Sequence, residues 1–288
     1  MPNIKYYNWC GGKQRCVNEF LSLIPEEITS WHELCVGSGI ITLNKARNEH
    51  EFVNDLDDSI YNLFALMSDK EDGKILLNRL LDIKYSEEAF KEALSMQKNK
   101  FEGIDKFTKA EMSFVLITQS FNSTRKAWRK GVNQLDYFYF LINNLPEVYK
   151  RLQGVAVTNR DCVEILREIK NDSNAGVLLD VPYRHELRGN KKIYHCEMSH
   201  EKHIELLNTI KDSSNKIILC GYLDKEDDLY DRFLLDKSQR WSRYKIAELV
   251  KSCQNKFRKD IAEEYIWVNY NLPEFSKALI DHSTKISI

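Results

Sequence analysis

The sequence has no long apolar run and no amino-terminal signal sequence. No stretch approaches the ~20 apolar residues that are needed to span a bilayer. The first residues, Met-Pro-Asn-Ile-Lys, lack the apolar core of a secretory signal peptide. We therefore expect a cytoplasmic protein without a membrane segment.

The sequence also lacks the cysteine spacing of disulfide or zinc sites and a large net charge. The seven cysteines are scattered without C-x-x-C spacing, which is typical of reduced thiols and not of a disulfide frame or zinc site. Three histidines lie close together, His195, His200 and His203, but no ligand pattern surrounds them, so we expect no metal. With a net charge of −1, any case for nucleic-acid binding must rest on local basic segments.

The first part of the chain has the order of elements of a parallel α/β fold. Residues 30–36 are predicted to form a strand, followed by a tight Gly-x-Gly turn and a helix over residues 40–48. A second strand at 51–55 and a second helix at 59–67 complete a βαβα opening. This order favours a doubly wound, mostly parallel twisted sheet.

A helical insertion is predicted to interrupt that sheet. The strand signal disappears over residues 69–150, where helical patterns dominate. The sheet resumes with predicted elements at residues 155–158, 162–170, 176–179, 200–211 and 216–220, and two late strands at 242–249 and 264–270 form a hairpin. The 288 residues suit one domain with an inserted subdomain, divided as 1–68 plus 151–288 and 69–150.

The predicted turn at Gly37, Ser38 and Gly39 is suited to a cofactor. Glycine allows a ligand to approach the backbone, and the following helix offers unpaired N–H groups. Asp55, 16 residues after Gly39 at the end of the next strand, is placed to accept both hydroxyls of a ribose. The third glycine of G-x-G-x-x-G is absent, because position 42 is Thr42. The pattern therefore suits a nucleoside cofactor without pyrophosphate, such as S-adenosylmethionine; a plain turn and a surface acid are the alternative.

Two further segments carry candidate site residues. Trp9 and Lys13 flank two glycines, and they suit a sulfonium or adenine and a carboxylate, respectively. Asp180, Val181, Pro182 and Tyr183 close the apolar run at 176–179. There an acid and a backbone carbonyl can accept hydrogen bonds from an exocyclic amine while the ring stacks on the base. An ordinary strand-end turn is the alternative.

These motifs, in this order, resemble the Dam-type, D12-class DNA adenine N6-methyltransferases. That family has W-x-G-G-K where residues 9–13 read W-C-G-G-K, a glycine-rich motif matched at 33–39, an acid matched by Asp55, and D-P-P-Y where residues 180–183 read D-V-P-Y. The resemblance runs from about residue 6 to residue 233. It implies a Rossmann-like methyltransferase that uses S-adenosylmethionine, without metal, to methylate the N6 amine of an adenine flipped out of double-stranded DNA.

The resemblance also assigns roles to residues. Trp9, Lys13, Asp55, Asp161 and Asp180 are expected to line the cofactor and target site, with Asp161 beside the cofactor adenine. Residues 69–150 become the target-recognition region. The residues expected to contact DNA combine basic, amide and aromatic side chains: Asn122, Arg125, Lys126, Trp128, Arg129, Lys130, Lys191 and Lys192. A basic run at 251–259 is a further candidate, and a solvated helix end is the alternative for residues 119–130.

Valine at position 181 departs from the family pattern, in which proline is usual. The carbonyl acceptor belongs to the backbone and survives the change, and Pro182 keeps residue 181 extended. Three readings stay open: a DNA methyltransferase, a weak or inactive member that binds DNA or cofactor, and an RNA N6-adenine methyltransferase. The oligomeric state, the recognition sequence and the setting (bacterial or phage-encoded, in a restriction-modification system or not) are also left open.

Overall fold

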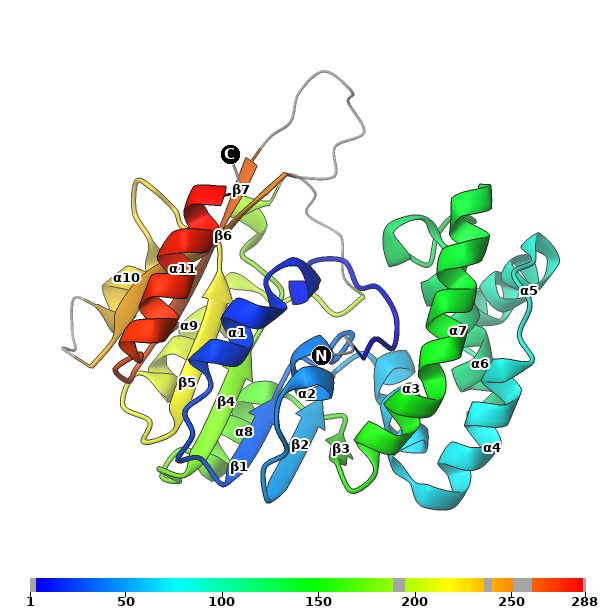
Figure 1. Cartoon of the computed structure of the whole chain (residues 1–288), viewed down its shortest axis with the longest axis horizontal. Helices are drawn as coiled ribbons and strands as arrows, with labels where there is room; N and C mark the ends of the chain where they lie inside the picture. Colours follow the sequence, from blue (N-terminus) through cyan, green and yellow to red (C-terminus); the bar gives the residue numbers. More distant parts are fainter. Residues whose placement is uncertain (1–3, 189–194, 236–239, 251–260, 287–288) are drawn as a thin grey trace. The chain divides into compact units, whose positions relative to one another are not determined.

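The computed structural model describes residues 4–188, 195–235, 240–250 and 261–286 (Figure 1). Two compact units share the chain. The first unit comprises Met1–Gln14, Val36–Arg47 and Glu51–Arg160. The second unit comprises Arg15–Cys35, Asn48–His50 and Asp161–Ile288. The predicted insertion, residues 69–150, falls inside the first unit together with the glycine turn.

The second unit is built on strands in the order β1-β4-β5-β7-β6. Strands β1 (Ser30–Glu33), β4 (Ala175–Leu179) and β5 (Lys216–Gly221) are parallel. Strand β7 (Ile261–Val268) runs antiparallel to both β5 and β6 (Ser242–Val250). Every residue of β4 is buried, as expected for a parallel strand that is covered on both faces.

Helices cover the strands of the second unit. They are α1 (Val17–Leu23), α8 (Cys162–Ile169), α9 (His200–Ile210), α10 (Leu229–Leu234) and α11 (Glu274–Ile286), with a short 3-10 helix η3 (His185–Leu187). Leu206 and Ile210 of α9 share an apolar core with Val177 and Leu179 of β4. Because β4 is anchored in that core, the residues that follow it are held in place.

The first unit joins two parallel strands to a layer of helices. Strand β2 (His50–Asn54) pairs with β3 (Ala156–Thr158). The helices are α2 (Ile40–Asn44), α3 (Asp58–Ser68), α4 (Lys70–Leu81), α5 (Glu87–Lys98), α6 (Lys106–Gln119) and α7 (Val132–Leu152), with 3-10 turns η1 (Lys13–Arg15) and η2 (Phe121–Ser123). In Figure 1 helices α4 to α7, coloured cyan to green, form a bundle.

Local capping sets the starts of the bundle helices. The Asp69 carboxylate accepts from two backbone N–H groups at the start of α4, and Asp105 does the same for α6. Ser86 accepts from the N–H of Ala89 at the start of α5. Such caps satisfy backbone donors that have no partner within the helix.

A buried ion cluster ties the end of α7 to β2. Glu51 accepts from Lys45 at 2.5 Å and from two nitrogens of Arg151 at 2.6 and 2.9 Å. Burial raises the pKa of the Glu51 carboxyl, but hydrogen bonds from Arg151 and Lys45 outweigh it, and the net pKa is lowered. The return of the chain from the helical layer to β3 is thereby fixed.

The predicted fold class is confirmed: the protein is α/β with a mostly parallel set of seven strands. The predicted late hairpin is present as β6 and β7. Helices α10 and α11 were not predicted. In the part of the chain that the structure describes, no helix is long and apolar enough to cross a membrane, and no group of His, Cys, Asp and Glu side chains is arranged to hold a metal ion.

Candidate active site

Two left-handed glycines shape the turn at residues 36–39 of the first unit. Gly37 has φ +49° and Gly39 has φ +64°, values that favour glycine. A Cβ at Gly37 would lie 2.7 Å from Cδ1 of Trp9, and one at Gly39 would lie 2.8 Å from Cζ of Phe64. The missing side chains let both rings pack against the turn backbone. Trp9 and Gly37, which are 28 positions apart in the sequence, are thus in contact.

Asp55 is fixed against this turn. Its Oδ2 accepts from the backbone N–H of Gly37, and its Oδ1 accepts from that of Asp57, both at 2.9 Å. Burial raises the pKa of the Asp55 carboxyl to about 6, although both backbone hydrogen bonds oppose the shift. The acid therefore has a defined orientation, and it titrates close to neutral pH.

The amino-terminal segment completes the cluster. The hydroxyl of Tyr7 donates to the carbonyl of Gly37 at 2.8 Å. Lys13 is buried, and its ammonium donates to the carbonyl of Gly11 at 3.1 Å. Ser38 is buried within the turn. The first unit therefore brings together an aromatic ring, a carboxylate that accepts hydrogen bonds and a glycine turn, which suit a nucleoside cofactor carrying a sulfonium.

A hairpin loop at residues 119–130 carries most of the residues predicted to contact DNA. A backbone bridge between Ser120 and Trp128 closes the loop. Asn122, Lys126 and Lys130 are exposed there, whereas Trp128 is half-buried with its ring 5.7 Å from that of Tyr85. Three of the six predicted residues on this loop are therefore exposed to solvent.

Two other members of the loop have partners inside the protein. The guanidinium of Arg129 is half-buried and lies 5.7 Å from the ring centroid of Phe121, which is 47% exposed. Arg125 is buried, and its two terminal nitrogens donate to Asp57 at 3.3 and 2.5 Å. The charge of Arg125 is therefore directed into the first unit and not towards solvent.

The motif at residues 180–183 lies at the carboxyl end of β4 in the second unit. Asp180 is half-buried, and Val181 and Tyr183 are buried. The Tyr183 hydroxyl donates to Oε2 of Glu264 at 2.6 Å, and its ring packs edge-on against Tyr222 at 4.6 Å. Burial, with Glu264 and Asp180 nearby, raises the pKa of Tyr183 well above its ordinary value. Tyr183 is therefore a neutral, fixed side chain.

The family model of the D12 class N6 adenine-specific DNA methyltransferases matches residues 9–250. The chain belongs to this family. No curated protein sequence matches it. The D12-class family membership confirms the predicted resemblance and implies use of S-adenosylmethionine.

Two solved structures align at low similarity. One is a protein from Legionella pneumophila, with a TM-score of 0.36 and 11% identity over 96% of this chain and 91% of that chain. The other is the rRNA methyltransferase aviRa from Streptomyces viridochromogenes, with a TM-score of 0.33 and 12% identity over 94% of this chain and 84% of that chain. Neither likeness bears on the substrate of the D12-class chain.

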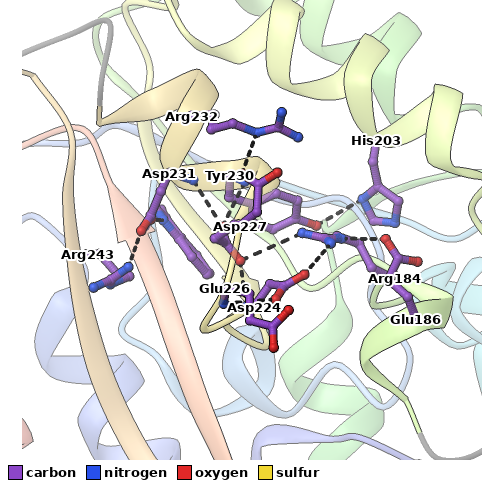
Figure 2. Close-up of polar contacts among 12 residues, drawn as sticks. Arg184, Glu186, His203, Asp224, Glu226, Asp227, Tyr230, Asp231, Arg232 and Arg243 are labelled. Carbon is purple, nitrogen blue, oxygen red and sulfur yellow. Dashed lines mark hydrogen bonds and ion pairs between the residues drawn. The ribbon is translucent and has the colours of Figure 1, made fainter.

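An arginine and an acidic cluster follow the motif of this methyltransferase (Figure 2). Arg184 is buried; its Nε donates to Glu186 at 2.8 Å and its Nη2 to Asp224 at 3.2 Å. Its Nη1 lies 3.7 Å from Asp228, which accepts from two backbone N–H groups at the start of α10. The loop after Tyr183 is thereby tied to α10.

A second contact in Figure 2 supports the same helix from α9. The hydroxyl of Tyr230 and Nδ1 of His203 are 2.9 Å apart. Burial lowers the pKa of His203 to about 4, so the imidazole is neutral at pH 7. The pair is a neutral hydrogen bond between α9 and α10.

Asp161 is among the described residues, whereas the predicted lysines Lys191 and Lys192 are not. Asp161 caps α8 by accepting from the N–H of Val163 at 2.8 Å, and it pairs with Lys202 at 2.6 Å. Its side chain is 30% exposed. Its predicted place beside the cofactor adenine stays a prediction. Lys191 and Lys192, and the basic run at residues 251–259, lie outside the described residues.

Sequence reasoning missed Glu264, Asp57 and the buried state of Arg125. Glu264 sits within a strand whose neighbours Tyr265, Ile266 and Trp267 are bulky and apolar. Glu263 and Glu264 are both acids in this otherwise apolar strand, and Glu264 is buried. An acid in such a strand is a usable signal, because a buried carboxylate needs a partner. Its pairing with Tyr183 depends on the register of β7 on β5, which short sequence motifs do not specify.

Proposed function

We propose that this protein transfers a methyl group from S-adenosylmethionine to the N6 amine of adenine in double-stranded DNA. The observation that carries the proposal is the family's acid–x–Pro–Tyr motif at the end of a buried parallel strand, with Tyr183 fixed by Glu264 at 2.6 Å. The family match over residues 9–250 supports the same reaction.

Residues of the first unit suit the cofactor. Asp55 is oriented to accept the ribose hydroxyls, and Trp9, which packs against Gly37, is the aromatic ring that suits a sulfonium cation. Lys13 carries the charge that would pair with the carboxylate of the amino-acid moiety. The bound cofactor supplies an already activated methyl group, so positioning accounts for much of the rate.

Residues of the second unit suit the target amine. The adenine amine is a poor nucleophile, because its lone pair is delocalised into the ring. Hydrogen bonds from the amine to Asp180 and to the carbonyl of Val181 favour a pyramidal nitrogen with an available lone pair. Tyr183 stacks on the base, which must leave the duplex at a cost of about a few kcal/mol.

Valine at position 181 is compatible with this role. Its side chain is buried in the core shared by β4 and α9, so it has a packing function of its own. The acceptor is the backbone carbonyl, which valine and proline both provide. We expect Val181→Pro to change the methylation rate by less than about tenfold, since no interaction with the amine is lost. A much larger gain would instead identify a decayed enzyme.

DNA contact is assigned to the exposed face of the hairpin loop. Lys126 and Lys130 are exposed cations for phosphates, and Asn122 is an exposed amide that can read an adenine edge. Phe121, which is 47% exposed, is better placed than the half-buried Trp128 to stack on a base. Arg125, with its charge engaged by Asp57, is not assigned to DNA.

Methyl transfer tests the proposal directly. Unmethylated duplex DNA incubated with the protein and labelled S-adenosylmethionine should yield labelled N6-methyladenine after digestion to nucleosides. Asp180→Ala is the matched inactive control and should transfer no label. Cofactor binding without transfer to any DNA supports an inert family member, and transfer to structured RNA in preference to duplex DNA supports the RNA alternative.

A further inference from the structure

Arg125 belongs to the hairpin loop, but its charged guanidinium pairs with a carboxylate inside the first unit. The guanidinium is buried and donates to both carboxylate oxygens of Asp57. It also lies 5.6 Å from the ring centroid of Trp9. A fork-shaped cation between a carboxylate and an aromatic face uses geometry that lysine does not reproduce.

Asp57 connects this pair to the turn that carries the cofactor residues. Its backbone N–H donates to Oδ1 of Asp55, and Oδ2 of Asp55 accepts from Gly37, each at 2.9 Å. Trp9, whose ring lies beside the Arg125 guanidinium, packs against Gly37. Two routes, one polar and one aromatic, therefore join Arg125 to the same glycine.

The loop is held in an unusual backbone conformation where it delivers Arg125. Asn122, Ser123 and Arg125 all have positive φ, between +50° and +58°. Such conformations are uncommon for residues other than glycine and persist where surrounding contacts hold them. The hydroxyl of Ser120 accepts from the N–H of Arg125 at 3.0 Å and provides one such contact.

We propose that Arg125 is a positioning residue that ties the hairpin loop to the cofactor turn, so that cofactor affinity depends on a loop side chain. The inference rests on the proposed use of S-adenosylmethionine by the first unit. It adds a residue that touches neither base nor cofactor and acts through Asp57, Asp55 and Trp9.

Binding of S-adenosylhomocysteine to the full chain, measured by calorimetry, tests this role. Arg125→Gln should weaken binding about tenfold, because a charged, buried hydrogen-bonded pair is lost. Arg125→Lys should weaken it less, since one charge contact can persist. Lys98→Gln is the matched control: it removes an exposed cation from α5 of the same unit, outside the loop, and should leave the affinity within about twofold of wild type.

A double-mutant cycle separates positioning from general destabilisation. Asp57→Asn keeps an oxygen that caps the N–H of Ser59 but removes the charge that Arg125 meets. If Arg125 acts through Asp57, Arg125→Gln should add little further loss of affinity in the Asp57→Asn background. Thermal unfolding of each variant checks that the measured molecules are folded.

The outcomes are distinct. Wild-type affinity in folded Arg125→Gln, or losses that add independently in the cycle, would overturn the positioning role and leave the proposed function intact. A wild-type protein that binds no S-adenosylhomocysteine would overturn the proposed cofactor use, and this inference with it.

Discussion

At the scale of single residues, Tyr183 is held at both its ring and its hydroxyl. Glu264 accepts from the hydroxyl, and Tyr222 packs on the ring. Tyr183→Phe should lower kcat about tenfold with little change in KM for cofactor, because ring orientation matters most in the transition state. Glu264→Gln should have a similar effect in wild type and little further effect in Tyr183→Phe. Steady-state methylation kinetics measure both.

Tyr265→Phe is the control for this pair. Tyr265 neighbours Glu264 on β7, and its hydroxyl lies 3.5 Å from Glu263, a long contact at a half-buried position. Removing this hydroxyl should leave kcat unchanged. Additive losses in Tyr183→Phe and Glu264→Gln would show that Glu264 acts by another route.

Asp55 predicts a pH dependence of cofactor binding. Its pKa is raised to about 6, mainly by burial. Because the carboxylate accepts hydroxyl donors at both oxygens and the neutral acid does so less well, affinity for S-adenosylhomocysteine should rise from about pH 5 to about pH 7. Calorimetry across this range should show a midpoint near 6. Asp55→Asn should remove that midpoint, and Asp58→Asn, at an exposed neighbour, should retain it.

The same shift affects folding with the opposite sign. A folded-state pKa above the unfolded value means that the native state favours the protonated acid. The stability linked to Asp55 is therefore present at low pH and is lost as the pH rises through about 6. Cofactor affinity and intrinsic stability are expected to change in opposite directions over this window.

Sequence patterns could identify candidate site residues that directly follow a predicted strand. Asp55 and the two glycines follow strand ends, and strand ends are readable from short apolar runs. In the sequence, Arg125 is one basic residue in a basic segment, like its exposed neighbours Lys126 and Lys130. The inward direction of the Arg125 side chain depends on positive φ values in the loop and on Asp57, which lies 68 positions away in the sequence. No local sequence pattern specifies either feature.

At the scale of elements, the contact between β2 and α7 depends on Glu51. Glu51→Ala deprives two buried cations, Lys45 and Arg151, of their carboxylate. Such a loss is expected to cost about 3–5 kcal/mol of unfolding free energy. Denaturant unfolding measures the change, and Glu49→Ala, at an exposed acid two positions away, should cost less than about 0.5 kcal/mol. Equal stability of the two variants would contradict a structural role for the cluster.

Element prediction succeeded where capping and periodicity agreed. Within the stretch predicted to be helical, residues 69–150, helix α5 spans Glu87–Lys98 and Ser86 caps it. The short helix α10 was missed because six residues give too little periodicity, and its start depends on Asp228, which also lies near Arg184. The predicted second hairpin strand began three residues late, since β7 starts at Ile261.

At the scale of the whole molecule, the net charge of this protein is far lower than that of strongly basic DNA-binding proteins. With a net charge of −1, non-specific attraction to DNA has to come from a few local cations. The hairpin loop supplies Lys126, Arg129 and Lys130. We therefore expect DNA affinity to fall less steeply with salt than it does for proteins that make many phosphate contacts.

The number of phosphate contacts sets how steeply DNA affinity falls with salt concentration. Each phosphate contact contributes a slope of about 0.9 to the fall of log affinity against log salt concentration. Replacing Lys126, Arg129 and Lys130 together by glutamine should therefore reduce the slope by up to about three, measured by anisotropy with a labelled duplex. Replacing Lys84, Lys98 and Lys100, three exposed lysines outside the loop, removes the same charge and should leave the slope unchanged. Equal effects of the two triple variants would mean that DNA responds to overall charge, and the loop would lose its assignment as the local DNA contact.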